Sequence, residues 1–228
     1  MSTTSRVLPW RRNQSAVVED LVPLLSAYKR RNPKGNVSLI NAAYEMASAA
    51  HSHQSRMSGE LYISHPIAVA RIVAEIGLDE VSLVAALLHD AVEDTEITLA
   101  DVEARFGAEV AGIVDGLTKL ERLQFDSREA QQAATMRKML VAMAKDMRVL
   151  IIKLSDRMHN MRTIASAPVD KQRRIAQETL DIYAPLAHRL GMQEMKQQLE
   201  DLSFAALYPK RYAELDYLVS TRAPERDV

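Results

Sequence analysis

Cysteine is absent from the 228 residues of this sequence, which excludes disulfide bonds and thiolate metal ligands and fits a reducing compartment. Any metal ion would therefore have to be bound by histidine and carboxylate side chains. Aromatic residues make up only 5%, and 29 Lys and Arg are balanced by 30 Asp and Glu. The sequence thus has neither the stacking platform nor the basic surface that is typical of nucleic-acid-binding proteins.

Long apolar runs are also absent. None reaches the roughly 18 residues that a membrane span requires, and residues 1–14 (MSTTSRVLPWRRNQ) lack the apolar core of a signal peptide. We therefore expect a cytoplasmic protein with no membrane part and no direct contact with nucleic acid.

Glycine is scarce, and apolar residues recur at helical spacing through most of the chain. Helix signals are clear: Pro66 suits a first turn, Gly77 a left-handed C-terminal cap, and Thr98 with Asp101 a capping box for the segment that ends near Gly107. Residues 149–154 have the composition of a buried strand, but the pattern continues beyond them without a turn signal and no second strand is evident. The sequence predicts an all-α fold.

Three parts are expected along the chain. Residues 1–14 lack periodicity and predict a flexible arm, residues 15–184 a helical domain, and residues 185–228 a helical extension. The polar stretch 124–132 (QFDSREAQQ) predicts a mobile loop near a site. The last residues, APERDV, carry neither periodicity nor a cap, and they resemble a cut within a longer protein more than a natural end.

The dipeptides His89-Asp90 and Glu93-Asp94 stand in the apolar run VSLVAALLHDAVEDTEI. On one continuous helix, His89 would lie beside Glu93, and Asp90 beside Asp94. Ionisable groups on a buried helix need compensation, and a metal cation is the simplest form of it. Further partners of the right type are available at residues 65 and 156.

Simpler interpretations exist for each residue taken alone. His65 could cap a helix, Glu93 and Asp94 could form a solvated helix end, and Asp156 could pair with Lys153 or Arg157 at the surface. The whole set nevertheless favours a metal site, because the simpler interpretation needs several coincidences. Mixed imidazole and carboxylate ligands suit Mn²⁺, Fe²⁺ or Zn²⁺ better than Ca²⁺ or Mg²⁺, and Mn²⁺ is our first choice.

The order of His65, His89-Asp90 and Asp156 resembles the pattern of HD phosphohydrolases, which implies an HD-type helical bundle. More specifically, the sequence is similar to the hydrolase domain of the bifunctional RelA/SpoT homologues, which make and degrade (p)ppGpp. The segments that carry this similarity are RMSGELYISHPIAVA, LVAALLHDAVEDT, VDGLTKL, IKLSDRMHNMRT, YAPLAHRLGM and LEDLSFAALYPKRY. The resemblance implies hydrolysis of the 3′-pyrophosphate of ppGpp or pppGpp, which gives GDP or GTP and pyrophosphate.

The same resemblance implies roles for individual residues. The implied ligands of one divalent ion, Mn²⁺, are His65, His89, Asp90 and Asp156. Glu93 and Asp94 would orient and activate the attacking water. Arg56 would pack on the guanine base and Asn160 would contact the ribose and phosphate, with Lys119 as a phosphate contact and Ser58, Tyr62 and Thr163 near the nucleotide.

Some residues match no family position or depart from it. Met57 and Leu61 differ from the residues common there, which affects details of base recognition. We expect His51 and His53 to be surface residues and His188 to be structural. Alternative functions are a catalytically silent regulatory module and an HD phosphohydrolase of another nucleotide. Synthetase and regulatory domains of a full-length protein are the expected partners, since no synthetase half is present.

Overall fold

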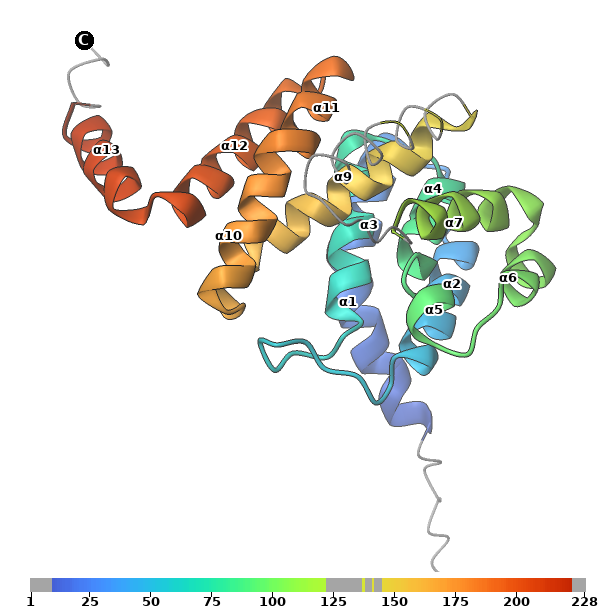
Figure 1. The fold of residues 1–228 in the computed structure, drawn as a ribbon. Helices are drawn as coiled ribbons and strands as arrows, with labels where there is room; N and C mark the ends of the chain where they lie inside the picture. The colour runs from blue at the N-terminus through green and yellow to red at the C-terminus, as the bar shows by residue number, and fades with distance from the viewer. Residues whose placement is uncertain (1–9, 122–136, 138–140, 142–144, 223–228) are drawn as a thin grey trace, which may run out of the picture. The chain divides into compact units, whose positions relative to one another are not determined.

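The computed structural model describes residues 10–121, 137, 141 and 145–222, with side chains from residue 20 onward apart from 120, 121 and 222 (Figure 1). The chain divides into two compact units. Unit 1 comprises residues 1–54 and 61–118, and unit 2 comprises residues 55–60 and 119–228. The described elements are helical, which confirms the predicted all-α fold. The loop predicted at 124–132 and the last six residues lie outside the described part of the chain.

Unit 1 is built around helix α4 (Glu80–Leu88), whose residues 82–88 are all buried. A helix that is apolar on every side has to be enclosed, and α4 packs against α2 (Ser38–Ala50) and α3 (Ser64–Ile76), while α1 (Trp10–Arg31) packs on α3. Helices α5 (Ala91–Asp94), α6 (Leu99–Phe106) and α7 (Ala108–Glu121) follow. Helix α1 begins at Trp10, so residues 10–14 are helical, and the arm expected over residues 1–14 stays a prediction.

The expected helix signals of unit 1 are confirmed. Pro66 lies in the first turn of α3, and Gly77 ends this helix with φ of 102° in the left-handed region. Thr98 and Asp101 form the predicted capping box of α6, which ends at Phe106, next to Gly107. Local sequence signals therefore determine where these helices begin and end.

The expectation of one continuous helix through residues 80–94 is wrong. Helix α4 ends at Leu88, and the short α5 begins at Ala91. The ring of His89 bonds the carbonyl of Ala86 at 2.7 Å, a carbonyl that the α-helical ladder would pair with the amide of Asp90. A new turn then starts, because the carbonyl of Asp90 accepts from the amides of Glu93 and Asp94 at 3.1 and 2.9 Å. The two polar dipeptides thus stand on a turn between helices.

Unit 2 contains α9 (Met147–Arg162), the 3₁₀ turn η1 (Ile164–Ser166), α10 (Val169–Glu178), the π turn η2 (Thr179–Tyr183), α11 (Ala184–Arg189), α12 (Gln193–Leu207) and α13 (Pro209–Arg222). Residues 149–154 are helical, as predicted. Helix α12 packs against α9, α10 and α11. The boundary expected at residue 185 stays a prediction.

The π turn η2 precedes Pro185 in α11. Proline has no amide hydrogen, and its ring clashes with the carbonyl four residues earlier, so the regular α-helical ladder cannot continue through this position. Beside the turn, Arg157 pairs with Glu178 at 3.2 Å and lies 4.0 Å from the ring centre of Tyr183. The widened turn is therefore held by half-buried contacts with α9.

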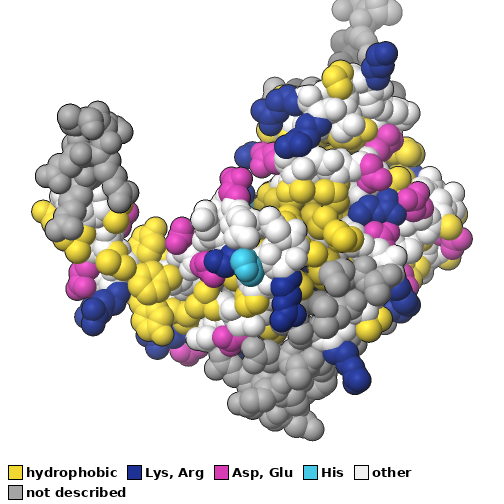
Figure 2. Space-filling model, turned by 90° about the horizontal axis from the view of Figure 1, so that it is seen from above, with side chains coloured by type: hydrophobic (Ala, Val, Ile, Leu, Met, Phe, Trp, Pro, Cys, Tyr) yellow, Lys and Arg dark blue, Asp and Glu magenta, His cyan; other side chains and the backbone are white. Residues whose placement is uncertain are grey.

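Helix α13 presents a different surface, because much of its apolar side-chain area is exposed. Hydrophobic side chains are visible along this part of the molecule at the left of Figure 2. The exposed large residues here are Tyr208, Tyr212, Leu215, Tyr217, Leu218 and Val219. Among the described residues, every helix is too short or too polar to traverse a bilayer.

Candidate functional site

Three predicted metal ligands meet in unit 1. His65 stands in the first turn of α3, and His89 follows the last residue of α4, with 5.4 Å between the two ring centres. The carboxylate of Asp90 reaches both rings, since Oδ1 lies 2.9 Å from His89 Nε2 and Oδ2 lies 3.6 Å from His65 Nε2. His65, His89 and Asp90 are only 5%, 4% and 9% exposed. Two imidazoles and a carboxylate are thus held together away from solvent.

The backbone of α4 determines the tautomer of His89. A carbonyl oxygen only accepts hydrogen bonds, so Nδ1 of His89 donates to Ala86 at 2.7 Å and carries the proton. In a neutral imidazole the lone pair then lies on Nε2. This arrangement is typical of metal-binding histidines, whose second nitrogen donates to a carbonyl or carboxylate.

Asp156 lies in unit 2, on the buried side of α9. Lys153 Nζ donates to its Oδ2 at 2.8 Å, and Asn160 Nδ2 donates to its Oδ1 at 2.7 Å. Burial alone would lower the pKa of Lys153, but the charges of Asp156 and Tyr183 raise it above its ordinary value. The alternative pairing of Asp156 with Lys153 is therefore present, although both side chains are buried and not at the surface.

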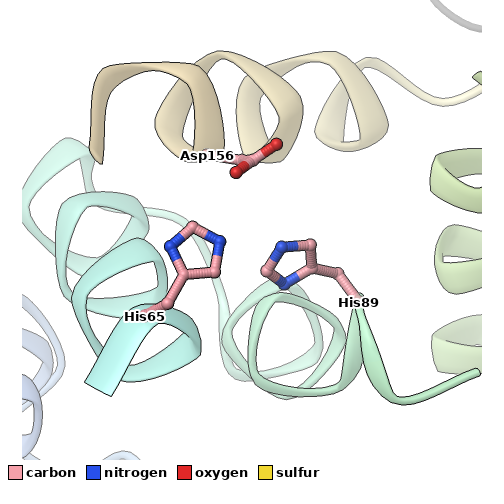
Figure 3. A group of neighbouring side chains, drawn as sticks. All are labelled: His65, His89 and Asp156. Carbon is pink, nitrogen blue, oxygen red and sulfur yellow. The ribbon is translucent and has the colours of Figure 1, made fainter. Parts of the chain in front are cut away.

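Three of the four predicted ligands form a group that could hold a metal ion: His65, His89 and Asp156 (Figure 3). Each offers one ligand atom, and these atoms all lie within 4.8 Å of one another. Asp90 is not part of this group, although its carboxylate adjoins both histidines. Two nitrogens and a carboxylate oxygen suit a transition-metal ion such as Mn²⁺, Fe²⁺ or Zn²⁺.

Glu93 and Asp94, the predicted catalytic pair, stand on α5. Asp94 is exposed and Glu93 half-buried. Asp94 also borders a cavity of about 450 Å³ within unit 1. The Tyr62 hydroxyl bonds Asp90 Oδ2 at 2.7 Å and Asp94 Oδ2 at 3.1 Å. Burial and the two carboxylates raise the pKa of Tyr62 far above its ordinary value, so this hydroxyl stays protonated and donates.

The predicted nucleotide contacts are partly assembled in unit 2. The guanidinium of Arg56 donates to Asn160 Oδ1 at 3.3 Å, to Thr163 Oγ1 at 3.4 Å and to His159 Nδ1 at 3.2 Å. Asn160 thus connects Arg56 to Asp156 through its two amide atoms. Ser58 is exposed and bonds Glu60, and Lys119 is exposed near the end of α7. The structure therefore brings Arg56, Asn160 and Thr163 together.

His51 was expected at the surface, and this is wrong, because it is only 2% exposed. Its ring stacks on Tyr62 with 4.5 Å between centres. The helical spacing of the buried residues Ile40, Tyr44 and Ala47 on α2 leads to position 51 and could have revealed this. His53 is exposed, as expected, and His188 is also exposed. The burial of Lys153, which the sequence interpretation named only as an alternative surface partner of Asp156, was not foreseen.

This helical fold, with two buried histidines and an aspartate, matches a known class. The HD domain family matches residues 43–193, and the chain belongs to this family.

Its relatives are RelA/SpoT proteins, which confirms the resemblance inferred from the sequence. The chain is 53% identical over 214 residues to a probable GTP pyrophosphokinase of Mycobacterium leprae. The match covers 94% of this chain and 27% of that protein. The chain is 49% identical over 208 residues to the bifunctional (p)ppGpp synthase/hydrolase SpoT of Escherichia coli, covering 91% of this chain and 29% of SpoT. The chain therefore spans between a quarter and a third of the length of these relatives.

A solved structure of a metazoan ortholog of SpoT that hydrolyses ppGpp is also similar. The two sequences are 25% identical, and the superposition has a TM-score of 0.47. The match covers 81% of this chain and 96% of the solved chain.

Proposed function

We propose that this chain is a metal-dependent hydrolase that removes the 3′-pyrophosphate of ppGpp or pppGpp and leaves GDP or GTP and pyrophosphate. The observation that carries the proposal is the buried group of His65, His89 and Asp156. Enclosed imidazoles and carboxylates have a high desolvation cost that a cation offsets. The names of the relatives include both synthases and hydrolases of (p)ppGpp, and the donor group favours the hydrolase.

The donor set supports one divalent ion, and we propose Mn²⁺. His65, His89, Asp90 and Asp156 would hold it. When bound, such an ion screens the phosphate charge and makes a water molecule more acidic. The tautomer of His89, fixed by Ala86, presents Nε2 as the ligand atom, and Asn160 and Lys153 hold the carboxylate of Asp156 in one orientation.

Glu93 and Asp94 are the proposed proton acceptors for the attacking water. The cavity that Asp94 borders gives its carboxylate access to solvent, which a general base on water requires. Glu93 stands beside it on the same short helix. Both carboxylates therefore stay in the proposal as one catalytic pair.

The nucleotide is the proposed ligand of Arg56, Asn160 and Thr163, with Ser58, Lys119 and Tyr62 as further contacts from the family resemblance. A planar guanidinium stacks well on a purine ring. In this structure three acceptors of α9 and its end already orient the Arg56 guanidinium. Less of the side chain's rotational freedom is therefore lost on binding.

The longer relatives indicate further partners. We propose that synthetase and regulatory domains of a full-length protein accompany this chain and that it acts in the cytoplasm.

The test is release of pyrophosphate and GDP from ppGpp by purified protein with Mn²⁺. We expect Asp90→Ala and Glu93→Ala to abolish release, and EDTA to abolish it in the wild type. Asp201→Ala, which removes an exposed carboxylate on α12, is the matched control and should retain activity. Undiminished activity in EDTA, or in the Asp90 and Glu93 variants, would contradict the proposal. Release from another nucleotide but not from ppGpp would leave the metal site and reject the substrate.

A further inference from the structure

We infer that Tyr62 is a positioning residue whose hydroxyl holds the carboxylates of Asp90 and Asp94 in a fixed arrangement, supported by the ring of His51. The inference rests on the proposed function, in which Asp90 binds the metal ion and Asp94 acts on water. All residues involved belong to unit 1.

The hydroxyl of Tyr62 is the point of connection. It carries a single hydrogen, and the shorter distance, 2.7 Å to Asp90 Oδ2, marks the main acceptor. Asp94 Oδ2 at 3.1 Å shares the same hydrogen as a weaker, second acceptor. Two carboxylates repel each other, so a donor placed between them is needed to keep both side chains turned towards one point. Tyr62 thus connects the proposed metal ligand to the proposed base.

The ring of Tyr62 is held in place by His51. The two rings are nearly parallel, at an interplanar angle of 24°, with 4.5 Å between centres. His51 Nδ1 donates to Gln54 Oε1 at 2.8 Å, and Gln54 Nε2 donates to the backbone carbonyl of Asp94 at 3.1 Å. The contacts therefore form a closed ring that runs from Asp94 through Tyr62, His51 and Gln54 back to Asp94.

His51 Nε2 supports a mechanical role for this ring. The atom is buried and has no hydrogen-bond partner among the described residues. An apolar ring would fill the same space without an unsatisfied nitrogen, but it would lose the hydrogen bond to Gln54 and with it the connection from His51 to Asp94. The histidine therefore combines a flat stacking surface with a donor at one edge.

The decisive variant is Tyr62→Phe, which removes the hydroxyl and keeps the ring. Substitution of a residue that hydrogen-bonds a metal ligand usually lowers metal affinity or activity by about 10–100-fold. We expect Mn²⁺ affinity, measured without nucleotide from the electron paramagnetic resonance of free Mn²⁺, to fall about tenfold or more. We expect kcat to fall as well, with KM for ppGpp unchanged. The matched control is Tyr44→Phe, which removes the hydroxyl of a buried tyrosine elsewhere in unit 1 and should alter none of these values.

The role of the supporting ring is tested by a pair of variants at position 51. His51→Ala removes the stacking surface and should reproduce the loss of Mn²⁺ affinity seen in Tyr62→Phe. His51→Phe keeps the surface and should retain more of the affinity than His51→Ala does. Circular dichroism of each variant verifies that the helices are intact.

The outcomes separate the inference from the function on which it rests. A wild-type protein that neither binds Mn²⁺ nor releases pyrophosphate overturns both. An active wild type with a raised KM and unchanged Mn²⁺ affinity in Tyr62→Phe overturns the inference alone and makes Tyr62 a nucleotide contact. Unchanged values throughout would likewise overturn the inference and leave the function intact.

Discussion

Lys153 places a positive charge on the buried side of α9, three residues before Asp156. Both side chains are only 8% exposed, and their charged atoms are 2.8 Å apart. Each charge offsets the desolvation of the other, and a buried pair of this kind is far more sensitive to loss of one partner than a surface pair is. The ammonium group of Lys153 therefore lies against the carboxylate of Asp156, the proposed metal ligand, and a carboxylate binds a metal ion in its ionised form.

We predict that Lys153→Met lowers the free energy of unfolding by about 3 kcal/mol, because a buried carboxylate loses its cation. Urea denaturation at pH 7 measures the change. The folded-state pKa of Lys153 is raised above 10.5, so the contribution of the pair is fully present below this pH and is lost as the pH rises through the folded-state pKa. Lys196→Met, at a half-exposed pair with Glu200 on α12, is the control and should cost less than 1 kcal/mol.

Sequence reasoning at this scale depended on residue type and spacing. His65, His89 and Asp156 were predicted as ligands, and the structure places one ligand atom of each in the same small group. A surface pairing of Lys153 with Asp156 was only an alternative interpretation, and its burial was not foreseen, since nothing in the local pattern distinguishes a buried lysine from one that covers an apolar face. The contacts of Tyr62 with Asp90 and Asp94 join residues that are 28 and 32 positions apart, and such pairs follow only from the tertiary fold.

Helix ends were predicted well where a familiar capping motif encodes them and poorly where a side chain bonds the backbone outside such a motif. The capping box of α6 and the glycine cap of α3 follow from short motifs. The end of α4 does not, because it depends on the ring of His89 bonding the carbonyl of Ala86. A hydrophobic pattern that continues through residue 92 concealed this end.

Helix α9 carries Asp156 and depends on the cap at its first turn. Asp146 accepts a hydrogen bond from the amide of Arg148 at 2.9 Å and pairs with its guanidinium at 2.7 Å. The bonds from Arg148 lower the pKa of Asp146 below its ordinary value of 3.8. The ionised carboxylate is therefore the form that stabilises the helix.

We predict that Asp146→Ala costs about 1 kcal/mol of unfolding free energy at pH 7, as loss of an N-cap does. Asp146→Asn keeps the acceptor for the amide and should cost less. Because the folded-state pKa is lowered, the contribution of the charge is present above pH 3.8 and is lost as the pH falls through the folded-state pKa. Chemical denaturation of the three proteins between pH 3 and pH 7 tests this, and a constant difference between Asp146→Asn and the wild type would contradict it.

For the chain as a whole, the fold class and family could be predicted, because both depend on helical periodicity and on motifs that span most of its length. The division into units could not. Residues 55–60 belong to unit 2, although the residues on both sides of them belong to unit 1. The sequence gives no sign that this short segment belongs to a different unit from the residues on both sides of it. The proposed ligands are divided in the same way, with His65, His89 and Asp90 in unit 1 and Asp156 in unit 2.

The wide spacing of the proposed ligands along the sequence leads to a prediction for metal removal. An ion held by His65, His89 and Asp156 binds the folded chain and not the unfolded one, so free Mn²⁺ at 100 times its Kd should add about 2.7 kcal/mol to the stability. Thermal unfolding in Mn²⁺ and in EDTA should therefore give a higher midpoint with the metal ion. Asp156→Asn should abolish the difference, whereas a shift of equal size in that variant would mean that Mn²⁺ binds elsewhere.

The π turn η2 also determines which changes of length the chain can accept. Residues 169–189 pass through α10, η2 and α11 without interruption, so the turn is equivalent to one residue inserted into a continuous helix. Each helical residue advances the direction of the side chain by about 100°, and the buried positions of Leu186 and Ala187 depend on that advance. Removing one residue from 179–183 would rotate both side chains away from their contacts. We therefore expect homologous chains to vary here by substitution and to keep the same number of residues.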